Sequence, residues 1–144
     1  MYVAAGQRQM SKGIDGMTQP NGGYILVADS VHLLRRQLVK LLSSTGYDAQ
    51  EAADGAQAIR TMQLDPPNLV LIDLQLTRIS GIEVCAWIRD NEATRNVPIV
   101  VCTSGQDRKS LEKAIRAGAT DVLVRPVTGD KLRARIEKHL DAIA

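Results

Sequence analysis

The sequence LVLID at residues 69–73 decides the fold, because four apolar residues in a row are followed directly by a carboxylate. A short unbroken apolar run is typical of a strand that is buried on both faces, as in a parallel sheet. The sequence YILVAD at residues 24–29 repeats this pattern, so that Asp29 and Asp73 each follow a buried strand. The two segments predict two strands of one parallel sheet, with acidic groups at their carboxyl ends.

Further strands and helices follow outward from these two segments. Short apolar runs predict strands at residues 99–102 and 122–124, and a weaker run predicts one at 48–52. Amphipathic stretches alternate with the strands; in the first, leucines recur at one helical face and Gly46 follows as a stop. Asp54 and Thr128 are expected to cap two later helices. Five strands alternating with five helices predict an α/β fold, a doubly wound parallel sheet with helices on both faces.

Length and composition indicate one globular domain. The chain has 144 residues, of which 44% are hydrophobic and 24% charged. Residues 1–23 have no sustained apolar period, so we expect a flexible N-terminal tail, followed by a domain at residues 24–144. No run approaches the roughly 18 apolar residues of a membrane-spanning helix, and no secretory signal is present. We therefore expect a cytoplasmic protein without membrane contacts, in which Cys85 and Cys102, which lack metal or redox spacing, are buried.

The charge is nearly balanced overall but uneven along the chain. The 18 Lys and Arg exceed the 16 Asp and Glu by two, whereas residues 108–138 hold nine basic residues and four acidic ones. A basic stripe of this kind attracts acidic proteins or nucleic acid. Aromatic and base-reading motifs are absent, so two helices with solvated basic faces are the simpler interpretation, and nucleic acid is not an expected partner.

Polar side chains follow four of the five predicted strands. They are Asp29 and Ser30 after the first strand, Asp73 after the third, Thr103 and Ser104 after the fourth, and Arg125 after the fifth. Because the carboxyl ends of parallel strands lie at one edge of the sheet, we expect these groups to converge there. Ligands bind at this edge in open parallel sheets, near the point where the strand order reverses.

The residue types at this edge favour one kind of chemistry. Asp-Ser-Val-His at residues 29–32 stands where a dinucleotide fold or a P-loop has glycines, and the lack of Phe disfavours a flavin site. An aspartate is a recognised nucleophile toward phosphorus, and a hard divalent cation, a basic side chain and a hydroxyl can offset the developing charge. Asp73, Asp29, Arg125 and Thr103 supply these types, so the residues fit capture of a phosphoryl group by an aspartate.

Several segments, in order and in spacing, resemble the receiver domain of two-component response regulators. They are ILVAD (25–29), LLRR (33–36), AADG (52–55), LVLID (69–73), SG (80–81), PIVV (98–101) and AGA (117–119). The resemblance extends from residue 24 to about residue 144. It implies a flavodoxin-like, five-stranded parallel sheet of order 2-1-3-4-5 that is flanked by five helices.

The resemblance also implies roles for individual residues. Asp73 would be the phosphoacceptor, the hydroxyl of Thr103 would bond the phosphoryl group, and Arg125 would be the counterpart of the family's lysine. Mg²⁺ would be the cofactor, held by Asp29, by Asp73 and by the backbone carbonyl of Gln75. The peptide bond before Pro126 would be cis, as is usual in the family.

Four positions depart from the family pattern. Ser30 replaces the second acidic metal ligand, so we expect weak Mg²⁺ binding in which Ser30 takes part weakly or through water. Arg125 replaces lysine, and its guanidinium can form a standing ion pair with Asp73 or Asp29. Thr77 stands where a proline is usual. Val122 replaces an aromatic residue whose ring movement is part of the usual output switch.

The sequence thus predicts a single-domain receiver in a phosphorelay. A histidine kinase or a phosphotransfer protein would donate the phosphoryl group, and the fourth and fifth helices would bind a downstream protein or a second copy of the chain. Such a protein is at most an Mg²⁺-assisted catalyst of its own phosphorylation and dephosphorylation. The alternative is a degenerate receiver that acts as an interaction module without phosphorylation. Ser30, Arg125 and Val122 favour this alternative, whereas the intact acceptor group opposes it.

Overall fold

Strands and helices alternate along the computed structural model, which describes residues 23–143. The strands are β1 (Ile25–Ala28), β2 (Ala49–Ala52), β3 (Leu69–Ile72), β4 (Ile99–Thr103) and β5 (Asp121–Val124). The helices are α2 (His32–Ser44), α3 (Gly55–Leu64), α4 (Gly81–Asp90), α5 (Arg108–Ala117) and α6 (Gly129–Ile143). The tail expected at residues 1–23 lies outside the described residues, except for Gly23.

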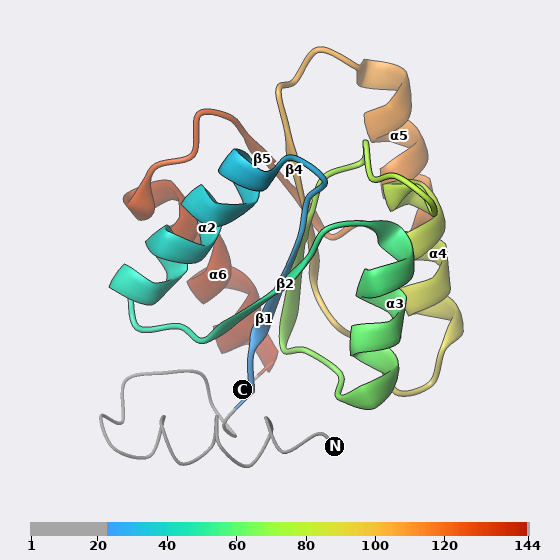
Figure 1. Cartoon of the computed structure of the whole chain (residues 1–144), viewed down its shortest axis with the longest axis horizontal. Coiled ribbons are helices and arrows are strands. Elements are labelled where there is room, and N and C mark those ends of the chain that lie inside the picture. Colours follow the sequence, from blue (N-terminus) through green and yellow to red (C-terminus); the bar gives the residue numbers. More distant parts are fainter. Residues whose placement is uncertain (1–22, 144) are drawn as a thin grey trace.

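The strands form one parallel sheet of order β2-β1-β3-β4-β5, as the sequence and the resemblance predict. The order reverses between β1 and β3, which lie side by side in the middle of the sheet with Ile25 opposite Leu69. The helices α2 and α6 cover one face, and α3, α4 and α5 cover the other (Figure 1). The fold is therefore the doubly wound, flavodoxin-like α/β fold that the sequence predicts.

The core consists of two apolar layers, one on each face of the sheet. Alternate residues of a strand point to opposite faces, so Leu26 packs toward α3 and α4 while Val27 packs toward α2 and α6. All four residues of β1 and of β3 are buried. Each large side chain buried in this way contributes about 1.5–3 kcal/mol relative to an exposed one. The two best-buried strands are therefore the ones that position Asp29 and Asp73.

Caps set the helix ends where the sequence predicts them. The carboxylate of Asp54 accepts a hydrogen bond from the amide of Gln57 at the start of α3. The hydroxyl of Thr128 accepts one from the amide of Lys131 at the start of α6. Gly118 ends α5 in a left-handed conformation with φ of 119°, which glycine adopts without steric cost.

The predicted strand limits are shifted by one residue in four strands. β1 begins at Ile25 and β2 at Ala49, whereas β4 extends to Thr103 and β5 begins at Asp121, opposite Val100. Cys85 and Cys102 are buried and unpaired, as predicted. Burial raises the pKa of the Cys85 thiol to about 11 and that of the Cys102 thiol to about 12. Among residues 23–143, no helix is both long enough and apolar enough to cross a bilayer.

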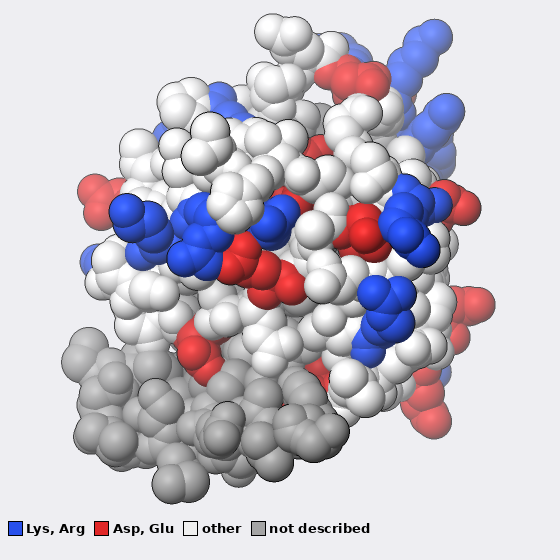
Figure 2. Space-filling view, viewed as in Figure 1, with Lys and Arg blue, Asp and Glu red and all other residues white. Residues whose placement is uncertain are grey.

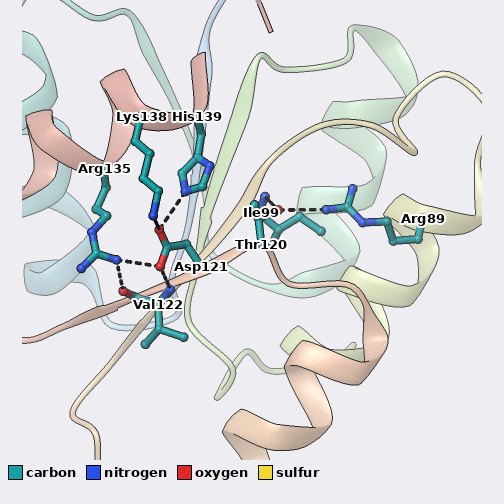
Figure 3. A network of polar contacts seen from close by, with 8 residues as sticks. All are labelled: Arg89, Ile99, Thr120, Asp121, Val122, Arg135, Lys138 and His139. Atoms are coloured by element: carbon teal, nitrogen blue, oxygen red, sulfur yellow. Dashed lines mark hydrogen bonds and ion pairs between the residues drawn. The ribbon is translucent and has the colours of Figure 1, made fainter. Parts of the chain in front are cut away.

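Hydrogen bonds from Arg89, in α4, fix the segment just before β5 (Figure 3). The hydroxyl of Thr120 accepts hydrogen bonds from the amide of Ile99, at 2.9 Å, and from the guanidinium of Arg89, at 3.1 Å. The same guanidinium also donates to the carbonyl groups of Gly118 and Val97. Arg89 therefore ties the segment before β5 to the segment before β4.

A cluster of charged groups fixes β5 to α6 in the same region (Figure 3). The carboxylate of Asp121 lies 2.6 Å from the guanidinium of Arg135, 2.8 Å from the ring of His139 and 3.8 Å from the ammonium of Lys138. Partial burial raises the pKa of Asp121, but the hydrogen bonds and the neighbouring cations outweigh it and lower the pKa below its ordinary value.

Candidate functional site

Two carboxylates and one guanidinium meet at the carboxyl edge of the sheet. Asp29 directly follows β1, Asp73 directly follows β3, and Arg125 directly follows β5. The Nη2 atom of Arg125 lies 2.7 Å from Oδ2 of Asp29, and its Nη1 atom lies 3.2 Å from Oδ2 of Asp73. The sequence predicts an ion pair with one of the two aspartates; in the structure a single guanidinium pairs with both.

This group of three charged side chains is largely shielded from solvent. Asp29 is 1% exposed, and the side chains of Asp73 and Arg125 are 14% and 19% exposed. Arg125 Nη1 also lies 3.3 Å from the carbonyl oxygen of Cys102, which holds the guanidinium over the end of β4. Removing one partner of such a buried pair typically costs about 3–5 kcal/mol, because a charge is left uncompensated.

Backbone amides bind the other oxygen of each carboxylate. The amide of Val31 donates to Oδ1 of Asp29 at 2.9 Å, and the amide of Gln75 donates to Oδ1 of Asp73 at 2.7 Å. Burial raises the pKa of Asp29 above its ordinary value and the negative charge of Asp73 adds to the rise, although the amide of Val31 and the charge of Arg125 oppose it. The carboxylates are thus oriented before any ligand binds.

Ser30 is turned toward the loop that follows β3. Its hydroxyl accepts a hydrogen bond from the amide of Thr77 at 3.1 Å and lies 3.5 Å from the hydroxyl of Thr77. The carbonyl of Thr77 in turn accepts a hydrogen bond from the amide of Gly55. Ser30 and Thr77, two of the departures from the family pattern, therefore link the loops after β1 and β3 to each other.

A small hollow opens beside Asp73. It has a volume of about 130 Å³, and its wall includes Asp73, Thr103 and Arg125, the three residues predicted to act on a phosphoryl group. The hydroxyl of Thr103 accepts a hydrogen bond from the amide of Gly105 at 3.1 Å. The structure thus brings the predicted acceptor, hydroxyl and cation to one hollow, and the peptide bond between Arg125 and Pro126 is cis, as the resemblance implies.

The oxygen donors at the site are of the kind that Mg²⁺ prefers, but few of them are anionic. The carboxylates of Asp29 and Asp73 and the carbonyl of Gln75 are hard oxygen ligands, which fit Mg²⁺. Within residues 23–143, no group of three or more His, Cys, Asp or Glu side chains is arranged to hold a metal ion. The oxygen donors are therefore of the type that Mg²⁺ prefers, but the site has one carboxylate fewer than the family pattern, because Ser30 replaces an acidic residue.

Arg35 positions the turn that carries Asp29, although no motif in the sequence points to such a role. Its Nη1 atom donates to the carbonyl oxygen of Asp29 at 2.9 Å, and its Nε atom donates to Oε1 of Glu51 at 2.8 Å. Arg35 thereby fixes the turn between β1 and α2 against β2. The sequence offers only a weaker signal, a charged residue between Leu34 and Leu38 in the first turns of a helix that packs on the sheet.

Charges of both signs lie on the face of the molecule that Figure 2 shows. On the face seen in Figure 2, Lys and Arg side chains lie next to Asp and Glu side chains, and further basic groups project over α5. Exposed basic side chains on α5 and α6 are Arg108, Lys109, Lys113, Arg116, Lys131, Arg133 and Lys138. Beside them, α5 exposes the apolar side chain of Ile115.

The fold and the site together define a class: a flavodoxin-like α/β domain with an acidic site where the strand order reverses. The chain belongs to the family of response regulator receiver domains, which it matches over residues 25–137. It is therefore a receiver domain of the kind found in response regulators of two-component systems.

Individual relatives show how far the likeness extends. A probable transcriptional regulator, ycf27, of Porphyridium aerugineum is 36% identical over 116 residues, which are 81% of this chain and 47% of the relative. The chain thus spans about half the length of that relative. Protein PilG of Pseudomonas aeruginosa is 27% identical over 85% of this chain and 90% of its own length.

Among solved structures, the receiver domain of a sensor histidine kinase from Pseudomonas aeruginosa has a TM-score of 0.78 to this chain. It is 26% identical, and the match covers 83% of this chain and 98% of that one. That structure holds a magnesium ion coordinated in the active site cleft.

Proposed function

We propose that Asp73 accepts a phosphoryl group from the phosphohistidine of a histidine kinase or of a phosphotransfer protein. The observation that carries the proposal is the hollow in which Asp73 faces Thr103 and Arg125. A nucleophilic carboxylate, a hydroxyl and a cation around one small space are the groups that phosphoryl transfer to an aspartate requires.

In the transfer step, a carboxylate oxygen of Asp73 forms a bond to phosphorus while the bond from phosphorus to the donor's imidazole nitrogen breaks. The electron pair of the broken bond stays on that nitrogen. Arg125, which already lies 3.2 Å from Asp73, offsets the negative charge on the phosphoryl oxygens, and the hydroxyl of Thr103 donates a hydrogen bond to one of them. The amide of Gln75 keeps the carboxylate oriented.

We propose Mg²⁺ as the cofactor of this step, bound weakly. Asp29, Asp73 and the backbone carbonyl of Gln75 would hold it, with Ser30 in a weak or water-mediated position. When bound, Mg²⁺ supplies positive charge that lowers the repulsion between the carboxylate and the incoming phosphoryl group. The oxygen donors of this chain and the magnesium in the related receiver support this assignment.

We propose that the output is binding of a downstream protein, or of a second copy of the chain, through α5 and α6. The exposed basic side chains of these helices and the exposed Ile115 support a protein partner. The mixed charges on the face that Figure 2 shows give no reason to expect nucleic acid as a partner of this domain.

The intact mass of the chain after incubation with a small phosphodonor and MgCl2 tests the phosphoacceptor role. We expect a gain of one phosphoryl group that depends on MgCl2, and no gain in Asp73→Asn, which keeps the shape of the side chain but lacks the nucleophilic oxygen. Folding of both chains is checked by circular dichroism. A folded wild type that gains no mass at any MgCl2 concentration supports instead an interaction module that works without phosphorylation.

A further inference from the structure

Arg125 occupies the position between the two site carboxylates with both arms of its guanidinium. Nη2 pairs with Asp29 at 2.7 Å and Nη1 pairs with Asp73 at 3.2 Å. A planar guanidinium presents its donors as a rigid fork, which a lysine ammonium cannot do. Arg125 is therefore able to draw the two carboxylates together by itself.

Every oxygen of the two carboxylates already receives a hydrogen bond from the chain. Arg125 binds Oδ2 of both aspartates, and the amides of Val31 and Gln75 bind the Oδ1 atoms. The proposed metal ligands are these same carboxylates, so a divalent cation has to compete with the guanidinium for them. The competition is strong because Arg125 is mostly buried and is also held by the carbonyl of Cys102.

Among residues 23–143, no third carboxylate joins Asp29 and Asp73 to help the metal in this competition. Ser30, in the place of the family's second acid, has no charge, and its hydroxyl is engaged by the amide of Thr77 at 3.1 Å. The two negative charges of Asp29 and Asp73 are thus half neutralised by Arg125 before any metal binds. Affinity for a divalent cation falls as the anionic charge of its ligands falls.

We infer that Arg125 is an internal cation that takes the place of the divalent metal between Asp29 and Asp73, and that it determines how tightly this site binds Mg²⁺. The inference rests on the proposed function, because it concerns the site that would accept the phosphoryl group. In the resting protein the carboxylate pair is held without a metal. Mg²⁺ binds only when the guanidinium gives up at least one of its two carboxylates.

Calorimetric titration of the full chain with MgCl2 tests the inference through binding alone. Arg125→Lys keeps the charge and removes the fork, so we expect it to bind Mg²⁺ about tenfold more tightly than the wild type. Arg125→Gln, which also removes the charge, is expected to gain at least as much. Arg116→Lys, the same exchange at an exposed position of α5, is the control and should leave the affinity unchanged.

The backbone amides of Val31 and Gln75 give a second readout, because each donates to one of the two carboxylates. In Arg125→Lys their NMR resonances should shift at MgCl2 concentrations that leave the wild type unchanged. The wild type is also melted with and without MgCl2, since a cation that binds the folded chain raises its melting temperature. An Arg125→Lys affinity equal to that of the wild type overturns the inference, as does a wild type whose melting temperature rises steeply with MgCl2.

Failure of this inference is distinguishable from failure of the proposed function. If Arg125→Lys gains affinity for Mg²⁺ while neither chain takes up a phosphoryl group, the internal cation stands and the phosphoacceptor role fails. If the wild type takes up a phosphoryl group while Arg125→Lys gains no affinity, the phosphoacceptor role stands and the internal cation fails.

Discussion

At the scale of single residues, the site depends on one cation that faces two buried anions. Arg125 compensates both Asp29 and Asp73, and burial raises the pKa of Asp29 even with this partner in place. The arrangement makes the guanidinium important for stability as well as for chemistry, because unpaired buried charges are costly.

Arg125→Ala should therefore destabilise the fold. We expect the free energy of unfolding at pH 7 to fall by about 3–5 kcal/mol, since two adjacent carboxylates lose their shared partner. The loss should shrink at acid pH, because Asp29, whose pKa is raised by burial, then takes up a proton and no longer carries an uncompensated charge. Urea unfolding at both pH values measures it, with Arg116→Ala at an exposed position as the control. Equal stability of Arg125→Ala and the wild type at pH 7 would show that the ion pairs contribute nothing.

Gly81, the first residue of α4, packs against the backbone that carries Asp73. A Cβ atom at this position would lie 2.6 Å from the carbonyl oxygen of Asp73 and 2.6 Å from Cα of Leu74. Gly81→Ala should therefore displace the acceptor loop, lower the free energy of unfolding by about 1–3 kcal/mol and slow phosphoryl uptake.

Gly129→Ala is the matched control for this prediction. Gly129 also begins a helix, but an added Cβ atom would meet only Cδ2 of Leu41, at an ordinary contact distance of 3.8 Å. Chemical denaturation and the rate of mass gain are compared for the two variants. If Gly81→Ala behaves like Gly129→Ala, the close approach of α4 to Asp73 does not matter for the site.

At the scale of secondary-structure elements, polar side-chain contacts hold the start of β5 in place. The carboxylate of Asp121 contacts three basic side chains of α6, those of Arg135, Lys138 and His139 (Figure 3). Since Arg125 follows β5 directly, the placement of this strand also places the site cation. The contacts between β5 and α6 lie at the amino end of β5, and they therefore help to position the site at its carboxyl end.

Because the pKa of Asp121 is lowered, the stability that its contacts add to the fold depends on pH. A carboxylate whose pKa is lower in the folded chain adds stability above its unfolded pKa, and that stability is lost as the pH falls through the folded pKa. Asp121→Asn should thus lower the free energy of unfolding by about 1–2 kcal/mol at pH 7.

The difference between Asp121→Asn and the wild type should vanish toward the acid end, where the carboxylate is protonated in both the folded and the unfolded chain. Unfolding by urea over a series of pH values between neutral and acid checks this. A deficit that is constant over the whole series would contradict the role assigned to the charge of Asp121.

At the scale of the whole molecule, the fold follows closely from the sequence. Unbroken apolar runs predict four of the five strands to within one residue at each end, because strands buried on both faces consist mainly of apolar residues. The other strand, β2, contains Gln50 and Glu51 and is only partly buried, and a weaker pattern predicts it. Asp54 and Thr128 mark helix starts that the structure confirms. The five-stranded order agrees with the resemblance to receiver domains.

The sequence predicts which residues form the site better than it predicts the contacts between them. The rule that strand ends meet at one edge brings Asp29, Asp73 and Arg125 together. It does not predict that one guanidinium binds both carboxylates, or that Ser30 turns toward Thr77. Those contacts depend on side-chain rotamers and on the approach of loops that are far apart in the sequence, which a residue pattern does not specify.

The measurement that tests the account most directly is the position of the modified residue after phosphorylation. The chain is incubated with a small phosphodonor and MgCl2 and then reduced with borohydride, which converts an aspartyl phosphate to homoserine, and its peptides are analysed by mass spectrometry. We predict that homoserine replaces Asp73 and no other aspartate. Homoserine at Asp29 or at another aspartate, or none in a folded and treated chain, would contradict the assignment of Asp73 as the phosphoacceptor.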